Sequence, residues 1–386
     1  MKNTFYIFIA NIFIFYSSAQ AQNKFTNNYN SRTQINISGY GTLSTNYSKQ
    51  YLKHRNINKA QTLVDGGLNF NIGYALFHDM TIGFNVLADT KYNKYYWQYD
   101  AGTMQELYSY IQNEYGRLEF GKLRDIAGKM NVSAPDVGLF GTNDSYIYNT
   151  LLIPHSTGGK KFFINSSTNI SFLQKRERIS IITSNKNKLR IGGTYTFGEK
   201  QHIPNNAGKL IQLQVNESIS VATKLSTNFM GNNNISLSLG YSKYDNLFIK
   251  DFAIAQNRHE LSSGINIFFK GITFGASVLK INETPFDNLI IANTFKYSYA
   301  GWAYNAGFAF EIGPWATSLS YHGSIAEGSL INPNNDKSHM TIFSMRRNLK
   351  KNLSFYTSFA GLILKNENKI KDNKGISITI GTIFKY

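Results

Sequence analysis

The chain has 386 residues, no cysteine and a formal net charge of +17. The absence of thiols excludes disulfide frameworks, cysteine-based zinc sites and cysteine nucleophiles. Aromatic residues make up 15% of a chain whose mean hydropathy is only −0.29, which indicates strands with one apolar and one polar face and excludes a disordered chain. The excess of Lys and Arg by itself suggests an anionic partner such as nucleic acid or lipid.

The N-terminal segment has the pattern of a secretory signal peptide. Lys2 precedes an apolar run over residues 5–16, and residues 19–21 (Ala-Gln-Ala) supply the small side chains of a cleavage site. The alternative is an N-terminal membrane anchor, but the run is shorter than the ~20 apolar residues of a spanning helix. We therefore predict a signal peptide over residues 1–21 and one exported domain over 22–386, which makes nucleic acid an unsuitable partner.

Beyond the signal peptide the hydrophobic period is two, which is the period of a β-strand. The longest alternating runs cover about ten to fourteen residues, whereas strands in soluble proteins average about five or six and a tilted membrane strand needs about nine to eleven. The polar faces are rich in Ser, Thr, Asn and Gly, which suits a water-filled lumen. The clearest alternation lies in residues 35–48, 68–76, 235–241 and 375–386.

Short turns and long polar connections alternate along the chain. This alternation predicts an all-β, transmembrane, antiparallel up-and-down barrel of about 16 strands, with both termini on the side of the short turns. No change in composition marks a second domain. The predicted short turns are residues 77–79, 114–116, 185–187, 270–271, 311–314 and 350–352, and the predicted long connections are 49–64, 91–103, 124–170, 199–217, 282–294, 325–337 and 366–374.

Four segments resemble the general porins of Gram-negative outer membranes. The first contains YIQNEYGRLEFGKLRD, the second RERIS followed by GGTY, the third a hairpin closed by Gly-Pro-Trp, and the fourth the basic hairpin MRRNLKKN. Their order and spacing carry the resemblance, which runs along the whole mature chain. One departure is Tyr386, which stands where the family more often has Phe. The four segments are residues 108–138, 176–198, 306–321 and 343–359.

The resemblance implies a homotrimeric, sixteen-stranded barrel in the outer membrane of a Gram-negative bacterium. It also implies that the long third loop, about residues 124–170, folds into the lumen and narrows a channel for small hydrophilic solutes and ions. The lipid bilayer and lipopolysaccharide are then the expected surroundings. The many lysines of the loops have two interpretations, namely solvated loop tips or contacts with lipopolysaccharide phosphates, and the first needs no special cause.

The constriction of such a channel sets acidic groups of the loop against basic groups of the wall. The loop offers Asp125, Asp136 and Asp144. On the wall, the alternation of apolar and polar residues predicts which side chains face the lumen, because an arginine facing lipid at mid-bilayer costs roughly 2–4 kcal/mol. We predict a weak anion preference; the alternative for each residue is an ion pair of the wall or a charge at the rim. The side chains predicted to face the lumen are Arg117, Glu119, Arg176, Arg178 and Arg190.

No motif predicts catalysis, and we expect neither an enzyme nor a cofactor or metal site. The sequence contains no H-E-x-x-H pair, no G-x-S-x-G elbow and no glycine pattern for nucleotide binding. Two rival hypotheses remain. One is a barrel of another class, either an adhesin or a substrate-specific channel, and the other is a soluble exported β-sandwich or solenoid enzyme, which the strand lengths disfavour.

Overall fold

A computed structural model gives the fold of the chain. The predicted signal peptide lies outside the residues that the structure describes, as do Asp144 and the predicted turn at residues 185–187. The described residues are 32–52, 55–77, 79–89, 104–138, 167–170, 176–184, 188–204, 210–229, 231–249, 254–283, 300–327, 335–366 and 373–386.

Strands account for nearly all of the described structure, and α2 (Ile126–Met130) is a single short helix between two of them. The strands are β1 (Thr33–Leu52), β2 (Arg55–Phe77), β3 (Met80–Asp89), β4 (Met104–Gln112), β5 (Gly116–Leu123), β6 (Arg176–Thr183), β7 (Leu189–Thr196), β8 (Glu199–Pro204), β9 (Leu210–Phe229), β10 (Asn233–Ile249), β11 (Ile254–Phe269), β12 (Ile272–Glu283), β13 (Gly301–Ile312), β14 (Trp315–Ala326), β15 (Asp336–Lys350), β16 (Leu353–Asn366) and β17 (Asn373–Lys385).

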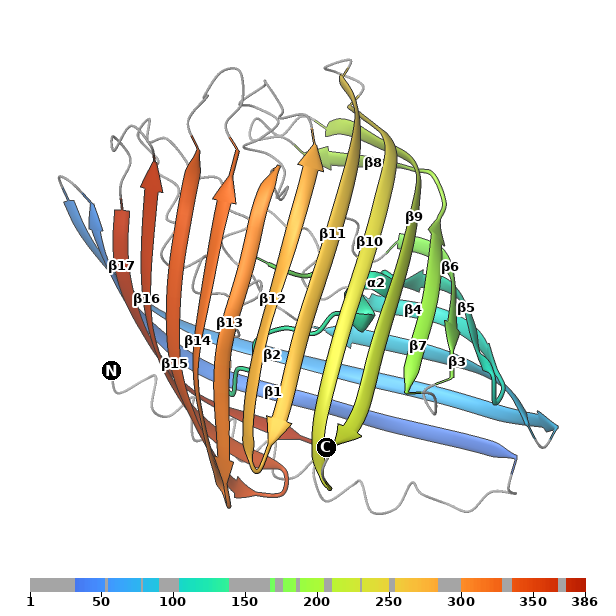
Figure 1. The fold of residues 1–386 in the computed structure, drawn as a ribbon, viewed down its shortest axis with the longest axis horizontal. Coiled ribbons are helices and arrows are strands. Elements are labelled where there is room, and N and C mark those ends of the chain that lie inside the picture. Colours follow the sequence, from blue (N-terminus) through green and yellow to red (C-terminus); the bar gives the residue numbers. More distant parts are fainter. Residues whose placement is uncertain are drawn as a thin grey trace.

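The strands form one closed antiparallel barrel (Figure 1). Closure is made by β1, which pairs with β2 on one side and with β17 on the other. Over the described ranges there are 17 strand segments, but β7 and β8 both pair with β9 and share one position around the barrel. The wall therefore has sixteen positions, which confirms the predicted fold class.

Side chains alternate between an apolar outer surface and a mostly polar interior. On β17, Ile376, Ile378 and Ile380 are exposed on the outside, whereas Ser377 and Thr379 are buried on the inside. The same alternation of exposed and buried side chains holds on β6 and on most of β15. Exposed apolar side chains around a closed barrel are what a lipid-facing surface requires, so the period-two pattern in the sequence directly marks the two faces.

Two of the predicted long connections are wrong. Residues 49–64 are mostly strand, because β1 and β2 pair up to Leu52 and Arg55. Residues 199–217 contain β8 and the start of β9. These segments are rich in Asn, Lys and Gln, so they lack hydrophobic alternation although their backbones continue to pair. The alternation of apolar and polar residues marks the part of a strand that lies in the lipid bilayer. It therefore stops where a hairpin extends beyond the bilayer.

The third loop enters the barrel after β5. The helix α2 contacts β7, β9 and β10, and Figure 1 shows it inside the wall, behind the front strands. Residues 131–138 continue along the inner surface, and residues 167–170 lie beside them. For these described parts of the loop, the predicted inward fold is confirmed.

Candidate functional site

The entrance of the inserted loop is held to the wall by two buried charged side chains. Asp125 precedes α2, and its Oδ1 accepts a hydrogen bond from Ala127 N at 2.8 Å, satisfying one of the free donors of the first helical turn. Asp125 Oδ2 also accepts a hydrogen bond from Ser220 Oγ on β9. On β6, Arg178 Nη1 donates to Leu123 O at 3.1 Å. Asp125 and Arg178 therefore attach the loop to β5, β6 and β9.

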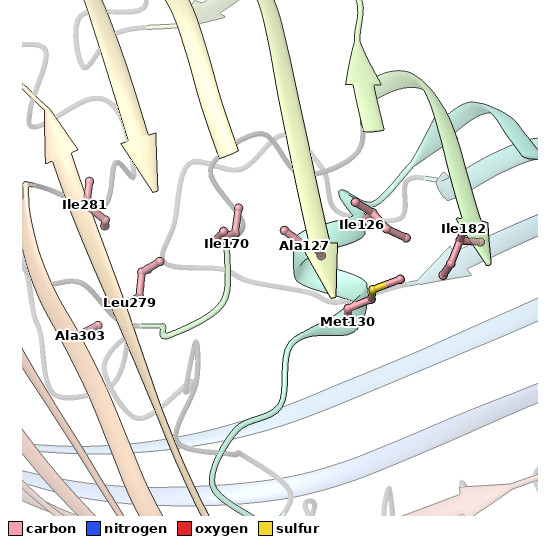
Figure 2. Close-up of a cluster of buried hydrophobic side chains, with 9 residues drawn as sticks. Ile126, Ala127, Met130, Ile170, Ile182, Leu279, Ile281 and Ala303 are labelled. Carbon is pink, nitrogen blue, oxygen red and sulfur yellow. The ribbon is translucent and has the colours of Figure 1, made fainter. Parts of the chain in front are cut away.

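One face of α2 packs into an apolar cluster inside the barrel (Figure 2). Each Ile, Leu or Met buried in such a cluster contributes roughly 1.5–3 kcal/mol. The contacts join the helix to the returning part of the loop and to strands β6, β9, β12 and β13, so the loop is fixed by packing as well as by polar contacts. The members are Ile126, Ala127 and Met130 of α2, with Ile170, Ile182, Ala222, Leu279, Ile281 and Ala303.

After α2 the loop follows the wall as an extended segment, and its backbone N–H groups donate to side chains of β10, β13 and β14. Val132 N donates to Ser238 Oγ on β10 at 2.9 Å, and Ala134 N donates to Asn305 Oδ1 on β13 at 3.0 Å. Val137 N then donates to a serine of β14 at 3.0 Å. Buried N–H groups without partners are costly, so these small polar side chains determine the path of the loop.

Two glycines of the wall let the loop approach closely. At Gly264 on β11 a Cβ atom would lie 1.8 Å from the carbonyl oxygen of Val132, and at Gly275 on β12 it would lie 2.9 Å from Pro135 Cδ. The distance at Gly264 is far below van der Waals contact with a backbone atom, so a side chain there would displace the loop. At Gly275 an added Cβ would meet Asn266 Oδ1 of the wall first, at 1.9 Å. These inward glycines form a shallow seat for residues 132–135.

Asp136 is fixed against the wall on the far side of the lumen from β5. Its Oδ1 accepts hydrogen bonds from Gly138 N at 2.7 Å and Ser318 Oγ at 3.3 Å, and its Oδ2 accepts one from Ser320 Oγ at 3.0 Å. Burial removes water from the carboxylate and raises the pKa of Asp136, and the hydrogen bonds only partly offset this effect. The group is thus a lumen carboxylate that is easier to protonate than an exposed aspartate.

A cluster of cations surrounds Glu119 on the inner face of β5. Arg117 Nε lies 3.0 Å from Glu119 Oε1, and Lys129 Nζ, from the last turn of α2, lies 2.7 Å from Glu119 Oε2. The Arg117 guanidinium also lies 3.7 Å from the centroid of the Tyr110 ring, a favourable cation–π distance. Arg117 and Lys129 therefore share the carboxylate of Glu119, and the Tyr110 ring packs against the guanidinium of Arg117.

Two further cations extend this cluster along the wall. Arg190 on β7 and Lys224 on β9 are direct cross-strand partners, and both side chains are half-buried on the inner face. Glu119 attracts Arg190, and Arg190 in turn repels Lys224. We call Arg117, Lys129, Arg190 and Lys224 the wall cluster. Among the described residues its four cations are matched by the single carboxylate of Glu119.

A second charged group lies deeper in the wall behind α2. Arg258 Nε donates to Glu260 Oε1 at 2.8 Å, and Tyr244 Oη donates to Glu260 Oε2 at 3.4 Å. All three side chains are buried, and Ser242 on the same strand as Tyr244 donates to Ser220, the partner of Asp125. An ion pair closed off from water in this way fixes the wall and the loop and has no free surface for a solute.

The structure brings only some of the predicted site residues together. Arg117, Glu119 and Arg190 lie in the wall cluster, whereas Asp125 and Arg178 meet at the buried entrance of the loop. Arg176, at the start of β6, is also buried, and Asp136 is held separately by β14. Asp144 lies outside the described residues. The predicted site residues lie in different places because the hydrophobic alternation shows which face of the wall a side chain lies on. It does not show the position of that side chain along the barrel axis.

Sequence reasoning missed Lys129, Lys224, Arg258 and Glu260. For Lys224, Arg258 and Glu260, the same alternation argument was available, since each lies at an inward position of its strand. Lys129 gives no such signal, because the direction of its side chain depends on a helix of only five residues inside the long third loop.

The described residues contain no helix that is long and apolar enough to cross a membrane. In the same part of the chain, His, Asp and Glu side chains nowhere gather in a group of three or more that could hold a metal ion.

Comparison with known proteins relates the chain to one family. A sequence profile of the Gram-negative porins matches residues 11–366. No curated protein is significantly similar in sequence.

Several solved structures share the fold. An anion-selective porin from Comamonas acidovorans is 14% identical, with a TM-score of 0.61 and coverage of 92% of this chain and 100% of that chain. Salmonella typhi OmpF, solved in complex with daunomycin, is 11% identical with a TM-score of 0.59, and the outer membrane channel DcaP of Acinetobacter baumannii is 10% identical with a TM-score of 0.58. Each of the latter two alignments covers 93% of this chain and 99% of the other. Because the family profile spans most of the sequence, the chain belongs to the Gram-negative porin family and forms a channel in the outer membrane.

Proposed function

We propose that the protein is a passive diffusion channel for small hydrophilic solutes and ions, with its constriction lined by the inserted loop and the wall cluster. The observation that carries the proposal is the attachment of residues 124–138 across the inner wall, from Arg178 on β6 to Ser318 on β14. A segment fixed at both ends of that path narrows the lumen to a set width.

We further propose a weak preference for anions. In support, the wall cluster has four cations around one carboxylate. A cationic lining raises the local concentration of anions in a low-dielectric channel. The structural neighbour from Comamonas acidovorans is described as anion-selective, although at 14% identity that likeness concerns the fold.

Planar-bilayer recording of the folded protein tests both proposals. Stepwise conductance is expected, and a reversal potential of the anion-selective sign is expected in a gradient of potassium chloride. A folded protein that never conducts would contradict the channel. A cation-selective potential would contradict the role of the wall cluster alone, because the channel itself would still be open.

Transport and current-block measurements with different solutes distinguish a passive diffusion channel from a substrate-specific channel. A diffusion channel should pass chloride, acetate and small neutral sugars with rates that follow size, and no single solute should block the current at millimolar concentration. Saturable transport of one solute, with block of the ion current by that solute, would support the specific channel instead.

We also propose that the protein assembles as a homotrimer. Support comes from the shared fold with Vibrio cholerae OmpT, which is described in a trimer form and matches with a TM-score of 0.54 at 9% identity. Native mass spectrometry of protein extracted in mild detergent should give three times the subunit mass. A single-subunit mass under conditions that retain channel activity would contradict the trimer.

A further inference from the structure

A group of buried polar atoms without hydrogen-bond partners lies near the point where the inserted loop leaves the wall. In the described part of the chain these atoms are Arg178 Nε and Nη2, Thr196 Oγ1 and Ser218 Oγ. The three residues are only 0%, 1% and 2% exposed, so bulk water and solutes in the lumen do not reach them. Buried polar atoms in folded proteins are nearly always hydrogen-bonded, and four unpartnered ones in one place point to a ligand.

The strand register places these atoms in one row on the inner face of the wall. Arg178 on β6 is the direct cross-strand partner of Thr196 on β7, and Thr196 is the direct partner of Ser218 on β9. These three strands lie next to one another in the barrel (Figure 1). Directly opposed Cβ atoms in a sheet are about 4.5–5.5 Å apart. The three side chains are therefore close enough to bind one ligand together.

The guanidinium of Arg178 presents the edge with which arginine binds anions. Its Nη1 donates to Leu123 O at 3.1 Å, and this bond fixes the orientation of the planar group. The N–H groups of Nε and Nη2 point away from the other edge as a parallel pair, which is the arrangement that binds carboxylates and phosphates. The hydroxyls of Thr196 and Ser218 add one donor each. The row thus offers donors from three strands to a single acceptor.

The charges around Arg178 are unbalanced. The charged side chains that act on it are Asp125, Arg176 and Glu106. Glu106 Oε1 lies 3.2 Å from Arg124 Nε in an ion pair, and both carboxylate oxygens of Asp125 accept hydrogen bonds from other groups. Three arginines therefore share two carboxylates, which leaves an excess of one positive charge. Buried charges in proteins are normally paired, so an anion would complete the group, whereas a water molecule would leave the charge uncompensated.

We propose that Arg178, Thr196 and Ser218 bind one small monovalent anion, namely chloride. The excess of one positive charge sets the valence, and the close spacing of the three adjacent strands favours a monatomic ion over a larger oxyanion. Because the site is closed to the lumen, the ion enters while the loop packs against the wall and is retained afterwards. It is a structural part of the loop attachment, distinct from the wall cluster, where Arg190 and Lys224 are only half-buried.

Bromide, which can replace chloride, is the probe for direct detection. The protein is folded in sodium bromide, transferred to sodium gluconate and then unfolded, and the released bromide is measured by ion chromatography. The wild type should release a single bromide per chain. The double variant Thr196→Val with Ser218→Ala lacks two of the donors and should release none. The matched control Ser324→Ala with Ser338→Ala removes two buried hydroxyls that hydrogen-bond to each other across β14 and β15, and it should release as much bromide as the wild type.

The half-life of the folded protein at one elevated temperature tests whether the ion stabilises it. Wild type folded and heated in sodium chloride should remain folded at least about tenfold longer than in sodium gluconate, as expected for an ion at about ten times its dissociation constant. In Thr196→Val with Ser218→Ala the two half-lives should be equal. In gluconate this variant should survive at least as long as the wild type, because it lacks the unpartnered hydroxyls. Arg190→Gln with Lys224→Gln should keep the chloride effect.

Three results would overturn the proposal. The first is a wild type that retains no bromide, which would assign the buried donors to water. The second is equal retention of bromide by the wild type and by Thr196→Val with Ser218→Ala. The third is loss of the chloride effect in Arg190→Gln with Lys224→Gln, which would place the ion in the lumen. If the variant at positions 196 and 218 does not fold, the bromide content of the wild type and the lumen variant decide the outcome.

Discussion

Asp136 is a loop carboxylate whose ionisation depends on its burial against the wall. Its pKa is raised above the ordinary value of 3.8 because burial disfavours the charged form. As the pH falls from neutral, Asp136 therefore becomes neutral before the exposed carboxylates do. The lumen then loses a negative charge, and the preference for anions should increase at a pH where an exposed aspartate is still ionised.

Reversal potentials measured between pH 7 and pH 4 in a fixed salt gradient test this expectation. In Asp136→Asn the early part of the increase should be absent, because the titrating group is gone. An unchanged titration in Asp136→Asn would show that another carboxylate is responsible.

Arg190 and Lys224 are the members of the wall cluster that most directly provide free positive charge. Unlike Arg117 and Lys129, neither lies in an ion pair with Glu119. Replacing both by Gln should lower the anion preference by more than half, since the net charge of the wall cluster together with Glu119 falls from +3 to +1. The control Arg347→Gln with Lys280→Gln removes two charges that stack on the outward-facing rings of Trp315 and Trp302, and its reversal potential should equal that of the wild type.

The inserted loop depends on the wall beneath it as much as on its own sequence. A side chain at position 264 would collide with the carbonyl oxygen of Val132, so Gly264→Ala should force the loop away from its seat. Overpacking of this kind costs about 1–3 kcal/mol. We expect a larger and noisier single-channel conductance. Gly193→Ala, on the outer face of β7, should leave the conductance unchanged, and a wild-type current from Gly264→Ala would contradict the seat.

The sequence predicts which side chains of a strand face lipid and which face the lumen. It does not predict how far along the barrel axis each side chain lies. The alternation around Arg178 or Ile378 reports which side faces lipid because a misplaced polar group is costly there. It carries no information on the register between strands, so Arg117 and Arg178 could not be separated into an exposed cluster and a buried entrance. The role of Asp125 as the cap of α2 depends on where the loop turns inward, a long-range contact that local patterns do not encode.

At the scale of the whole molecule, stability depends on closure of the ring. The strand β17 pairs with β1 from Asn373 to Lys385, and Tyr386 exchanges two backbone hydrogen bonds with Gly39, at 2.9 and 3.0 Å. Each of the sixteen positions around the barrel thereby has a neighbour on both sides. In a membrane this is necessary, because unpaired backbone groups at a sheet edge cannot be satisfied by lipid.

Deleting residues 373–386 should therefore abolish the folded barrel rather than shorten it. The deletion leaves β16 and β1 as two long open edges, and each unpaired N–H or C=O group facing hydrocarbon costs several kcal/mol. Deleting Tyr386 alone removes only the pair of bonds to Gly39 and should leave a folded barrel of lower stability. Unheated gel electrophoresis and protease resistance in detergent distinguish the two states. A protease-resistant, conducting protein without residues 373–386 would mean that fifteen positions can close, and that the register of the wall is not fixed by β17.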